Sequence, residues 1–465
     1  MTLPQLDKLV AIGQLKDGDK KRGGGVRRYK PYPKYKDSGV EWLGEVPEHW
    51  DIKPLLAVSV ERKVKNTGNI ENNVLSLSYG KIIRRSVDTD FGLLPASFET
   101  YQIIEPGDII LRLTDLQNDQ RSLRTGCAKE RGIITSAYLC LRPSNSVDSR
   151  YLHYLLHAYD IQKIFYSMGG GVRQSMGFGD LRRLPVTIPV SDEQQAIAAF
   201  LDRETARIDA LIEKKQRLIE LLKEKRQAII TQAVTKGLDP NVPMKDSGVE
   251  WLGEVPAHWE VLPLKRLVSK IVSGTSVNAI DKPAENGELA VLKTSSVYSG
   301  NFEANENKTV VEEDLHRVSC PVVKNTLIVS RMNTPSLVGA AGYVSDDYPN
   351  IYLPDRLWMV FFDISVVPQF VHYWTMTSIY RTQVEMVCAG TSSSMQNISQ
   401  GDFLGFYLAI PPKAEQGKIV ERLTKQCTQI CKLITTLEFS VNLLKERRAA
   451  LITAAVTGQI DVRGE

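Results

Sequence analysis

The chain has 465 residues, 43% of them hydrophobic, which is enough apolar material for about three globular domains. Its 58 basic and 54 acidic residues leave a net charge of only +4, so any contact with nucleic acid must come from local patches rather than from bulk positive charge. No stretch approaches the roughly 18 uncharged apolar residues of a membrane span, and the N-terminus lacks an apolar signal-peptide core. We therefore expect a cytoplasmic protein without a membrane partner. The six cysteines form no Cys-x-x-Cys pair, so no bound metal is expected.

Residues 1–34 are predicted to form a flexible basic arm. The segment KDGDKKRGGGVRRYK, which starts at Lys16, places several cations around three glycines. Two interpretations stay open, a solvated tail and a segment that contacts phosphates.

Two pairs of internal repeats organise the chain. Residues 36–50 read KDSGVEWLGEVPEHW and residues 245–259 read KDSGVEWLGEVPAHW, so fourteen of fifteen positions match. Further on, IPVSDEQQAI at residue 188 and LKEKRQAIITQAVTKGLD at residue 222 align with IPPKAEQGKI and LKERRAALITAAVTGQID, each 222 residues later. A period of this size corresponds to a whole domain rather than to a solenoid repeat. We expect two similar units, each a variable block closed by a similar helix.

Both variable blocks are predicted to be mainly β with some helix. The first contains short β-rich runs between Gly, Pro and Asn turns, namely NVLSLSY from Asn73, DIILRLT from Asp108 and AYLCLRP from Ala137. The second contains AVLKTSSVY from Ala290, NTLIVSRM from Asn325 and LWMVFF from Leu357. Helical segments are predicted from Arg150 (RYLHYLLHAYDIQKIFY) and from Pro368 (PQFVHYWTMTSIYRTQVEMV).

A long helix is predicted after each block. Between Ser191 and Lys236 there is no Pro or Gly, Ser191 can cap the start, and Gly237 ends the segment. The second helix is expected from about Lys413 to Thr457. Apolar residues recur at coiled-coil intervals at Ile197, Leu201, Ile208, Leu211, Leu218, Leu222 and Ile229, and again at Ile419, Leu423, Ile430, Leu433, Leu437, Leu444 and Leu451.

Chain order then predicts the fold class. The second helix can bury its apolar stripe only by folding back along the first, so the two should run antiparallel. We expect an α+β protein in which two mixed, β-rich domains are separated and joined by two long antiparallel coiled-coil helices with pseudo-two-fold symmetry. The expected domains are 35–189 and 239–411, and the expected helical spacers are 190–238 and 412–465, the latter including a C-terminal tail.

The chain resembles the specificity subunit of type I restriction-modification enzymes from Tyr35 to Val462. The resemblance is carried by SGVEWLGEVPEHW before the first domain and its copy SGVEWLGEVPAHW before the second, PGDIILRLTDLQNDQRSLRTG from Pro106, GIITSAYLCLRP from Gly132, LPDRLWMVFF from Leu353, and the start of each long helix. The first helix departs from the family pattern, because it reads IPVSDEQQ where a second Pro is usual; the basic arm lies outside the resemblance.

This resemblance implies a non-catalytic chain whose two target-recognition domains read a bipartite site in double-stranded DNA. It also implies two methyltransferase subunits and motor-nuclease subunits as partners. The methyl donor and ATP would be bound by those partners, and no cofactor by this chain. The sequence agrees, since it contains no amino-methyltransferase Asn/Asp-Pro-Pro-Tyr/Phe run, no Walker motif, and no nuclease Glu-x-Lys after Pro354-Asp355.

Candidate DNA contacts are side chains that can donate to or accept from base edges, or pair with phosphates. They are Ser78, Tyr79, Lys81, Arg84, Arg112, Thr114, Asp115, Gln117, Asn118, Arg121, Arg124, Arg173, Gln174, Lys293, Ser295, Ser296, Arg331, Asn333 and Ser336. The alternative is an ordinary hydrophilic surface. The glycine-rich MGGGVRQSMGFGD from Met168 lacks the Gly-Lys-Ser/Thr of a P-loop, so it is either a turn that brings Arg173 and Gln174 to the DNA or a plain connector.

The repeated segment is a candidate docking surface, because a surface that meets the same partner twice must itself be the same twice. Its candidate residues are Trp42, Leu43, Trp251 and Leu252. Alternatively, Trp42 and Trp251 pack each repeat against its own helix. Two other classes of function stay open for the whole chain, a helical scaffold whose end domains bind proteins rather than DNA, and an enzyme with dispersed catalytic residues.

Overall fold

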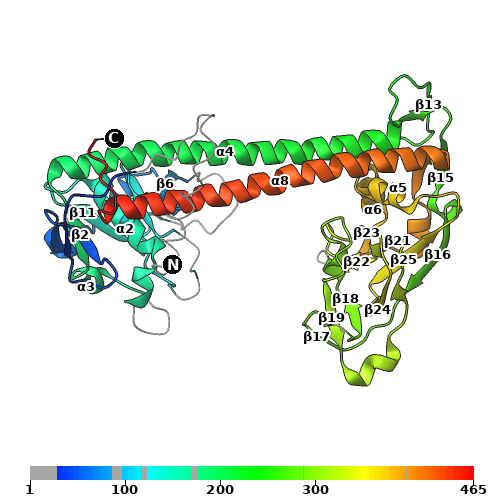
Figure 1. Cartoon of the computed structure of the whole chain (residues 1–465), viewed down its shortest axis with the longest axis horizontal. Helices are drawn as coiled ribbons and strands as arrows, with labels where there is room; N and C mark the ends of the chain where they lie inside the picture. Colours follow the sequence, from blue (N-terminus) through cyan, green and yellow to red (C-terminus); the bar gives the residue numbers. More distant parts are fainter. Residues whose placement is uncertain are drawn as a thin grey trace. The chain divides into compact units, whose positions relative to one another are not determined.

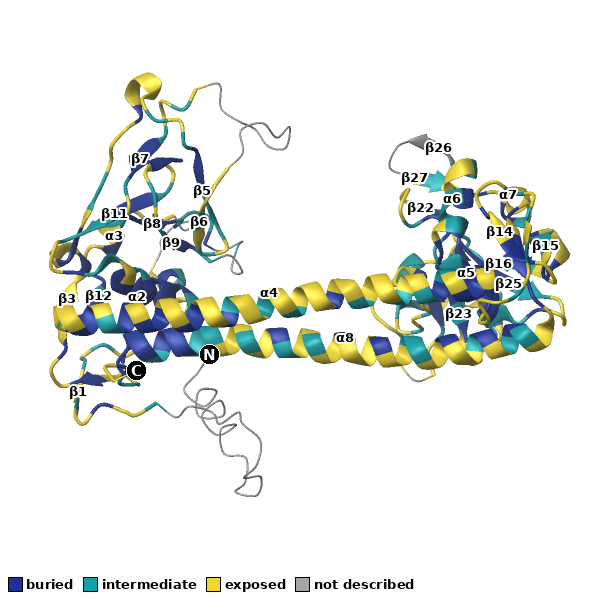
Figure 2. Cartoon of the chain, turned by 90° about the horizontal axis from the view of Figure 1, so that it is seen from above, coloured by how far each residue is buried: buried dark blue, intermediate teal, exposed yellow. Residues whose placement is uncertain are grey.

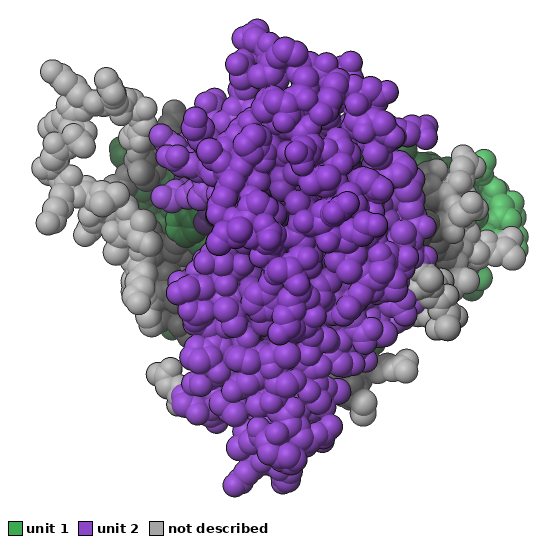
Figure 3. All heavy atoms as spheres, turned by 90° about the vertical axis from the view of Figure 1, so that its right-hand side faces the viewer, with its two compact units in different colours: residues 1–214, 439–465 green, residues 215–438 purple. Residues whose placement is uncertain are grey.

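The structure is a computed structural model that describes residues 29–85, 97–116, 119, 123–168, 175–285, 287–392 and 395–464. The chain divides into two compact units, unit 1 (residues 1–214 and 439–465) and unit 2 (residues 215–438), which are coloured separately in Figure 3. Each unit contains one β-rich block and part of each of two long helices, α4 (Ser191–Lys236) and α8 (Lys413–Val456). The four expected domain boundaries stay predictions, and residues 1–28 of the basic arm lie outside the described residues.

The bounds of the two long helices confirm the sequence prediction. Helix α4 has 46 residues and begins at Ser191, and α8 has 44 residues and begins at Lys413. Gly237 and Gly458 follow the helices with φ of 75° and 77°, the left-handed conformation in which glycine commonly terminates a helix.

Contacts within each unit show that α4 and α8 run antiparallel, as Figures 1 and 2 also show. In unit 1 the Arg448 Nε donates to Asp209 Oδ1 at 2.9 Å, and in unit 2 the Arg226 Nη1 donates to Cys431 Sγ at 3.4 Å. Arg226 lies seventeen residues after Asp209, whereas Cys431 lies seventeen residues before Arg448, so the helices run in opposite directions. Ile219, Ile430 and Ile434 form a buried cluster between them in unit 2.

Part of the predicted apolar seam is wrong. Leu211, Leu218 and Leu433 are 41%, 44% and 54% exposed, whereas Ile208 and Ile430 are buried. Near their ends the helices are covered both by each other and by a block, as the buried residues in Figure 2 show, but many residues along their middle are exposed. Apolar periodicity alone does not distinguish these two environments.

Unit 1 is built on a four-stranded antiparallel sheet with strand order β4-β11-β8-β9. These strands are β4 (Ser59–Glu61), β11 (Leu139–Pro143), β8 (Ile109–Leu111) and β9 (Thr125–Cys127). Two-stranded pairs surround it: β1 (Tyr35–Asp37) with β2 (Glu45–Pro47), β3 (Asp51–Pro54) with β12 (Pro185–Ile188), β5 (Leu75–Ser78) with β6 (Lys81–Arg84), and β7 (Gln102–Ile104) with β10 (Gly132–Ile134). Helices α2 (Ser149–Ile161) and α3 (Phe178–Leu181) complete the block. Helix α2 packs into the same core as the start of α4 and the end of α8.

Unit 2 repeats this plan. Its central antiparallel sheet has the order β16-β25-β21-β23, formed by β16 (Val268–Ser273), β25 (Leu357–Phe362), β21 (Thr326–Ser330) and β23 (Ala341–Val344). The outer pairs also recur, as β13 (Met244–Asp246) with β14 (Glu254–Pro256), and β15 (Glu260–Pro263) with β28 (Tyr407–Ile410). The helical segment predicted from Pro368 contains two helices, α5 (Pro368–Thr375) and α6 (Ser378–Val387), and the Thr377 side chain caps the start of α6 by accepting from Tyr380 N.

Unit 2 also has a second sheet of five strands, with the order β17-β19-β18-β24-β20. Its strands are β17 (Ala279–Ile280), β19 (Asn307–Val310), β18 (Ala290–Leu292), β24 (Tyr348–Tyr352) and β20 (Pro321–Val322). A three-stranded sheet of β22 (Met332–Asn333), β27 (Met395–Asn397) and β26 (Ala389–Ser392) precedes α7 (Gln400–Leu404). The fold class is therefore confirmed as α+β, with two β-rich blocks and two long antiparallel helices, while the pseudo-two-fold relation between units stays a prediction.

The repeated segment ends in an indole that is held by the start of the long helix. Trp50 is fully buried, and its Nε1 donates to Glu193 Oε1 at 3.1 Å. His49 Nε2 contacts the other oxygen of Glu193 at 2.8 Å. The next residue, Gln194, accepts from Asp148 N at 2.9 Å at the start of α2. We call this arrangement the Glu-Gln clip.

Unit 2 contains the same clip. Trp259 Nε1 donates to Glu415 Oε1 at 3.2 Å, His258 Nε2 contacts Glu415 Oε2 at 2.8 Å, and Gln416 accepts from Val367 N at 2.7 Å before α5. The two repeats in the sequence, the His-Trp ending and the Glu-Gln helix start, are thus two halves of one structural contact. Internal packing accounts for the identity of this part of the repeat.

Among the described residues, no helix is long and apolar enough to span a membrane.

Candidate nucleic-acid interface

The β5–β6 hairpin presents polar and aromatic side chains to solvent in unit 1. Its two-residue turn, Tyr79-Gly80, has φ of 45° and 76°, and positive φ at both turn positions is the geometry of a type I′ hairpin. Tyr79 is 88% exposed at the tip. Leu77 and Ile82 anchor the hairpin against Gly126 of β9, where a Cβ would lie only 2.7 and 2.9 Å from their Cδ1 atoms. The chain therefore holds Tyr79 on a fixed support, where its ring could stack on a base.

The cations of this hairpin form ion pairs at its surface. Lys81 Nζ lies 3.1 Å from Asp209 Oδ2, and Arg84 Nε lies 2.9 Å from both carboxylate oxygens of Glu130. Ser78, at the end of β5, is half-buried. Exposed ion pairs are weak and screened by salt, so Lys81 and Arg84 can still exchange a carboxylate for a phosphate.

The loop between β8 and β9 is organised by one buried guanidinium. Arg124 is fully buried, and its Nη1 donates to the carbonyl oxygens of Arg112 at 3.1 Å and Thr114 at 2.8 Å. Its Nη2 donates to the carbonyls of Asp115, at 3.1 Å, and Asp119. Arg124 thus fixes the backbone of the loop, and we call this contact the unit 1 loop clamp.

This geometry corrects the prediction that Arg124 reads bases, because its donors are turned inward to carbonyl groups. Arg112, Thr114 and Asp115 are half-buried. The Arg112 Nη2 lies 3.5 Å from Asp119 Oδ2. The predicted contacts Gln117, Asn118 and Arg121, and Arg173 and Gln174 of the glycine-rich stretch, lie outside the described residues.

A second loop clamp, which the sequence patterns did not predict, occurs in unit 2. Arg381 of α6 donates from Nη1 to Val338 O at 2.7 Å and from Nη2 to Pro335 O at 2.9 Å. The preceding Tyr380 donates from its hydroxyl to Gly339 O at 2.7 Å. The held loop follows β21, which occupies the same sheet position as β8 in unit 1. The clamping arginine comes from a different element in each unit, so no sequence repeat indicated it.

The structure separates the unit 2 candidates into accessible and buried side chains. Ser336 is exposed, and Arg331 is half-buried with its Nε donating to Asp355 O at 2.8 Å. Asn333 is buried, and its Nδ2 donates to Tyr298 Oη at 2.8 Å and Ser330 Oγ at 3.2 Å. The prediction that Asn333 reads a base is therefore corrected, because its amide is already satisfied within the fold.

The segment after β18 gives a similar result. Ser296 is fully buried, which corrects its assignment as a DNA contact. Ser295 Oγ donates to Glu306 Oε2 at 2.6 Å, and Lys293 Nζ lies 2.9 Å from Asp281 Oδ1. The hydrogen bond with Asp281 raises the pKa of Lys293, so this lysine is charged at neutral pH.

The docking candidates divide in the same way. Leu43 and Leu252 are each only 7% exposed and belong to the cores of their units, so they are corrected to core residues. Trp42 and Trp251 remain 37% and 38% exposed. The Trp42 ring packs edge-on against Tyr159 of α2, with 4.6 Å between ring centroids, so it has an internal partner as well as an accessible face.

The described part of the chain contains no group of three or more His, Cys, Asp or Glu side chains that could bind a metal ion. Two histidines lie on α2, where desolvation lowers the pKa of His153 to about 4 and that of His157 to about 3. His157 Nδ1 is hydrogen-bonded to Thr125 Oγ1 at 3.0 Å. Both histidines are therefore neutral at physiological pH, and His157 supports β9.

Comparisons with known proteins found similar sequences and a similar fold. Residues 128–221 match the family described as type I restriction modification DNA specificity domain. The chain is 24% identical over 420 residues to the type I restriction enzyme EcoKI specificity subunit of Escherichia coli K12, covering 86% of each chain. It is 25% identical over 209 residues to the EcoEI specificity subunit of Escherichia coli, where the match covers 43% of this chain and 34% of that protein.

The fold has a solved counterpart in a structure that describes complex assembly and conformational transition of the type I R-M system. The TM-score is 0.64 at 14% identity, and the match covers 88% of this chain and 98% of the other. This likeness supports the fold alone. The chain is similar in sequence to type I restriction-modification specificity subunits, and residues 128–221 match the family model of their DNA specificity domain.

Proposed function

We propose that this chain reads the DNA target of a type I restriction-modification complex, with each unit recognising one half of a bipartite site. The observation that carries the proposal is the duplicated loop support. In each unit, the strand at the same position of the central sheet, β8 or β21, leads into a loop whose backbone is held by an arginine. A constant scaffold with different loops suits recognition of two different half-sites.

The side chains that remain accessible suit DNA contact. In unit 1 they are Tyr79, Lys81 and Arg84 on the hairpin, and in unit 2 Thr334 and Ser336 lie exposed on the held loop. Aromatic rings, cations and small hydroxyls contact bases and phosphates in protein–DNA complexes. Arg112 and Arg331 are half-buried and would need to turn outward to reach the groove.

We further propose that the chain is a non-catalytic subunit of a cytoplasmic complex. The relatives are named as specificity subunits of type I restriction enzymes. By analogy, two methyltransferase subunits would bind the repeated surfaces around Trp42 and Trp251, and motor-nuclease subunits would join them. The methyl donor and ATP would be bound by those partners rather than by this chain.

A domain exchange tests the proposal. Residues 51–185 would be replaced with the corresponding domain of another specificity subunit, and methylated positions would be mapped in a genome that carries the complete system. We expect one half of the recognised sequence to change while the other half stays the same. The matched control exchanges residues 260–406 and should change the opposite half. A change of both halves by either exchange would contradict independent reading.

A filter-binding series across salt concentrations distinguishes a DNA reader from a protein-binding scaffold. Purified full-length chain should retain duplex DNA, with affinity falling as salt rises because phosphate contacts release counterions. Absence of DNA retention at low salt, both alone and with the modification subunits, would favour the scaffold.

A further inference from the structure

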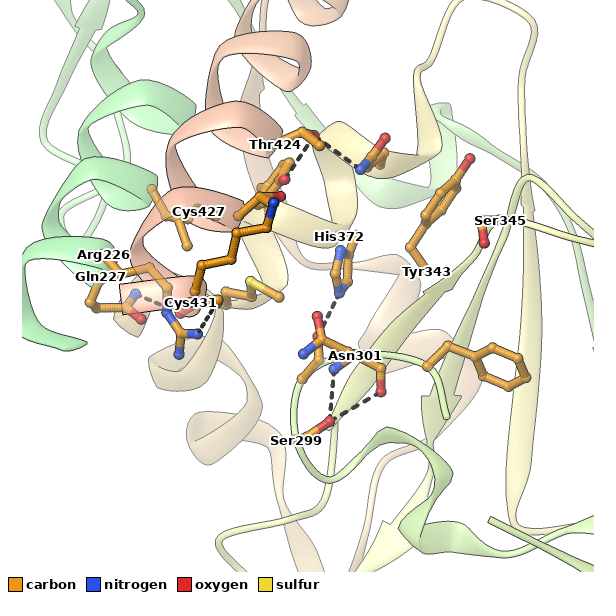
Figure 4. Close-up of a pocket in the computed structure, with 18 of the residues that line it drawn as sticks. Arg226, Gln227, Ser299, Asn301, Tyr343, Ser345, His372, Thr424, Cys427 and Cys431 are labelled. Atoms are coloured by element: carbon orange, nitrogen blue, oxygen red, sulfur yellow. Dashed lines mark hydrogen bonds between the residues drawn. The ribbon is translucent and has the colours of Figure 1, made fainter. Parts of the chain in front are cut away.

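A large polar groove lies within unit 2, between its parts of α4 and α8 on one side and α5 with the turn at residues 298–302 on the other (Figure 4). Its volume is about 1200 Å³. Arg226 and Gln227 of α4 and Cys431 of α8 face Ser299 and Asn301 of the turn across it. The lining includes two cations, Arg226 and Lys432, and no Asp or Glu. The groove is therefore electropositive.

Hydroxyl groups supply most of the remaining polar lining. Four threonines of α8 line the groove, Thr424, Thr428, Thr435 and Thr436, all of them exposed. The opposite wall adds Ser299 and Ser345. Hydroxyls and guanidinium groups without a carboxylate form the donor set that phosphate oxygens require.

The internal repeat provides a comparison within the same chain. The 222-residue offset relates Arg226 to Arg448 and Cys431 to Asp209, and the structure contains both contacts, Arg226 with Cys431 and Arg448 with Asp209. The same offset relates Thr424 to Asp202 and Thr435 to Glu213. A tyrosine in each unit confirms the alignment. The Tyr373 hydroxyl is hydrogen-bonded to Thr424 Oγ1 at 3.0 Å, and the Tyr154 hydroxyl donates to Asp202 Oδ1 at 2.8 Å.

Unit 1 thus has three carboxylates where unit 2 has two threonines and a thiol. In unit 1 two of these carboxylates neutralise nearby cations: Asp209 pairs with Arg448 and Lys81, and Asp202 pairs with Arg150 at 3.0 Å. In unit 2, Arg226 and Lys432 form no ion pair with a described residue, and a thiol is only a weak acceptor for Arg226. The charge that unit 1 balances internally is left unbalanced in unit 2.

We propose that this groove binds the sugar–phosphate backbone of DNA, with Arg226 and Lys432 pairing with phosphates and the hydroxyls of Thr428 and Thr435 donating hydrogen bonds. The inference rests on the proposed function and adds a backbone-binding surface to unit 2 that unit 1 lacks. Its size favours a polymer over a small anion. From Thr424 to Thr436 the helix rises about 18 Å, and one DNA strand places about five phosphates along that length.

The decisive variant is Cys431→Asp, which introduces the carboxylate that unit 1 already carries. The new carboxylate should pair with Arg226 as Asp209 pairs with Arg448, so the fold should be kept while the Arg226 guanidinium gains an anionic partner and no longer binds a phosphate. We expect the slope of log affinity against log salt for a mixed-sequence DNA duplex to become shallower by about 0.9, the value of one lost phosphate contact. Between 50 and 200 mM salt this corresponds to about a threefold smaller loss of affinity.

Companion variants of the full-length chain separate the outcomes. Arg226→Ala should change the slope as Cys431→Asp does, and the double variant should change it no further, because both remove one contact. Lys432→Ala should remove a second contact. The control, Lys265→Ala, removes an exposed lysine that does not line the groove and should leave the slope unchanged. Thermal unfolding checks that each variant is folded.

Three results would overturn the inference. If Cys431→Asp and Arg226→Ala keep the wild-type slope while wild type binds DNA, the groove does not contact the backbone, although the proposed function stands. If inorganic phosphate raises the thermal stability of wild type but not of Arg226→Ala, and the DNA slope is unaffected, the groove is a small-anion site. If wild type binds no DNA at low salt, alone or with the modification subunits, the proposed function itself fails.

Discussion

Removing the glutamate of the Glu-Gln clip should destabilise unit 1 more than unit 2. The Glu193 side chain is 2% exposed, whereas that of its counterpart Glu415 is 30% exposed. In Glu193→Ala the indole nitrogen of the buried Trp50 loses its acceptor where water cannot replace it, and a buried unsatisfied donor costs about 1–3 kcal/mol. With the second contact, to His49, we expect a loss of about 3 kcal/mol for Glu193→Ala and about 1 kcal/mol for Glu415→Ala.

Urea unfolding followed by circular dichroism and tryptophan fluorescence measures both losses. The two variants are compared with each other because both glutamates bind a tryptophan and a histidine, while Glu193 Oε1 also lies 3.9 Å from Arg463 Nε. Trp50→Phe in the Glu193→Ala background should cost less than in the wild-type background, since the orphaned donor is then removed. Equal losses at Glu193 and Glu415, or losses below about 0.5 kcal/mol at both, would refute the idea that burial of the clip stabilises the helix start.

Three further predictions concern the loop clamp, pH and helix length. Arg124→Lys should destabilise unit 1 by about 3 kcal/mol and abolish recognition of one half-site only, because lysine cannot reproduce the fork of donors to four carbonyls. Urea unfolding measures the loss of stability and methylation mapping measures the loss of recognition. Methylation of both half-sites at the wild-type level would contradict the prediction. Desolvation holds the pKa of His153 near 4, below the value of about 6.5 that histidine has in an unfolded chain. The free energy of unfolding should therefore keep the full contribution of this histidine above pH 6.5 and lose it as the pH falls toward 4. A His153→Gln variant should show a flatter urea-midpoint profile over that range, and an unchanged profile would exclude this histidine as a source. Inserting one turn of helix near residue 236 should lengthen the spacer between half-sites, at about 1.5 Å of rise per residue, and methylation mapping that finds the same spacer would show that the helices do not set it.

Much of the fold could be predicted because its signals are local. The absence of Pro and Gly from Ser191 to Lys236, followed by a left-handed Gly237, is enough to define a long helix and its end. The β-rich runs predicted from Asp108, Asn325 and Leu357 coincide with β8, β21 and β25 for the same reason. The two repeats are sufficient to indicate two similar units, and the repeated topology confirms them.

The roles of individual polar residues could not be predicted in this way. Arg124, Asn333 and Ser296 lie in polar stretches typical of exposed loops, yet all three are buried. Their surroundings come from distant parts of the chain, as when Arg124 Nε donates to the hydroxyl of Tyr166 forty-two residues away. A polar residue in a loop can face solvent or hold the backbone, and only the packed neighbours decide between the two.

The sequence by itself therefore determined the repeated architecture, the bounds of the long helices and the resemblance to specificity subunits, because these depend on neighbouring residues and on chain order. Tertiary structure alone decided which side chains hold the loops and where charge is balanced. The joining of the His-Trp repeat to the Glu-Gln helix start spans 143 residues in unit 1. The unbalanced cations of the unit 2 groove likewise depend on which helix faces α8, since an arginine is neutralised only by the group that folding places beside it.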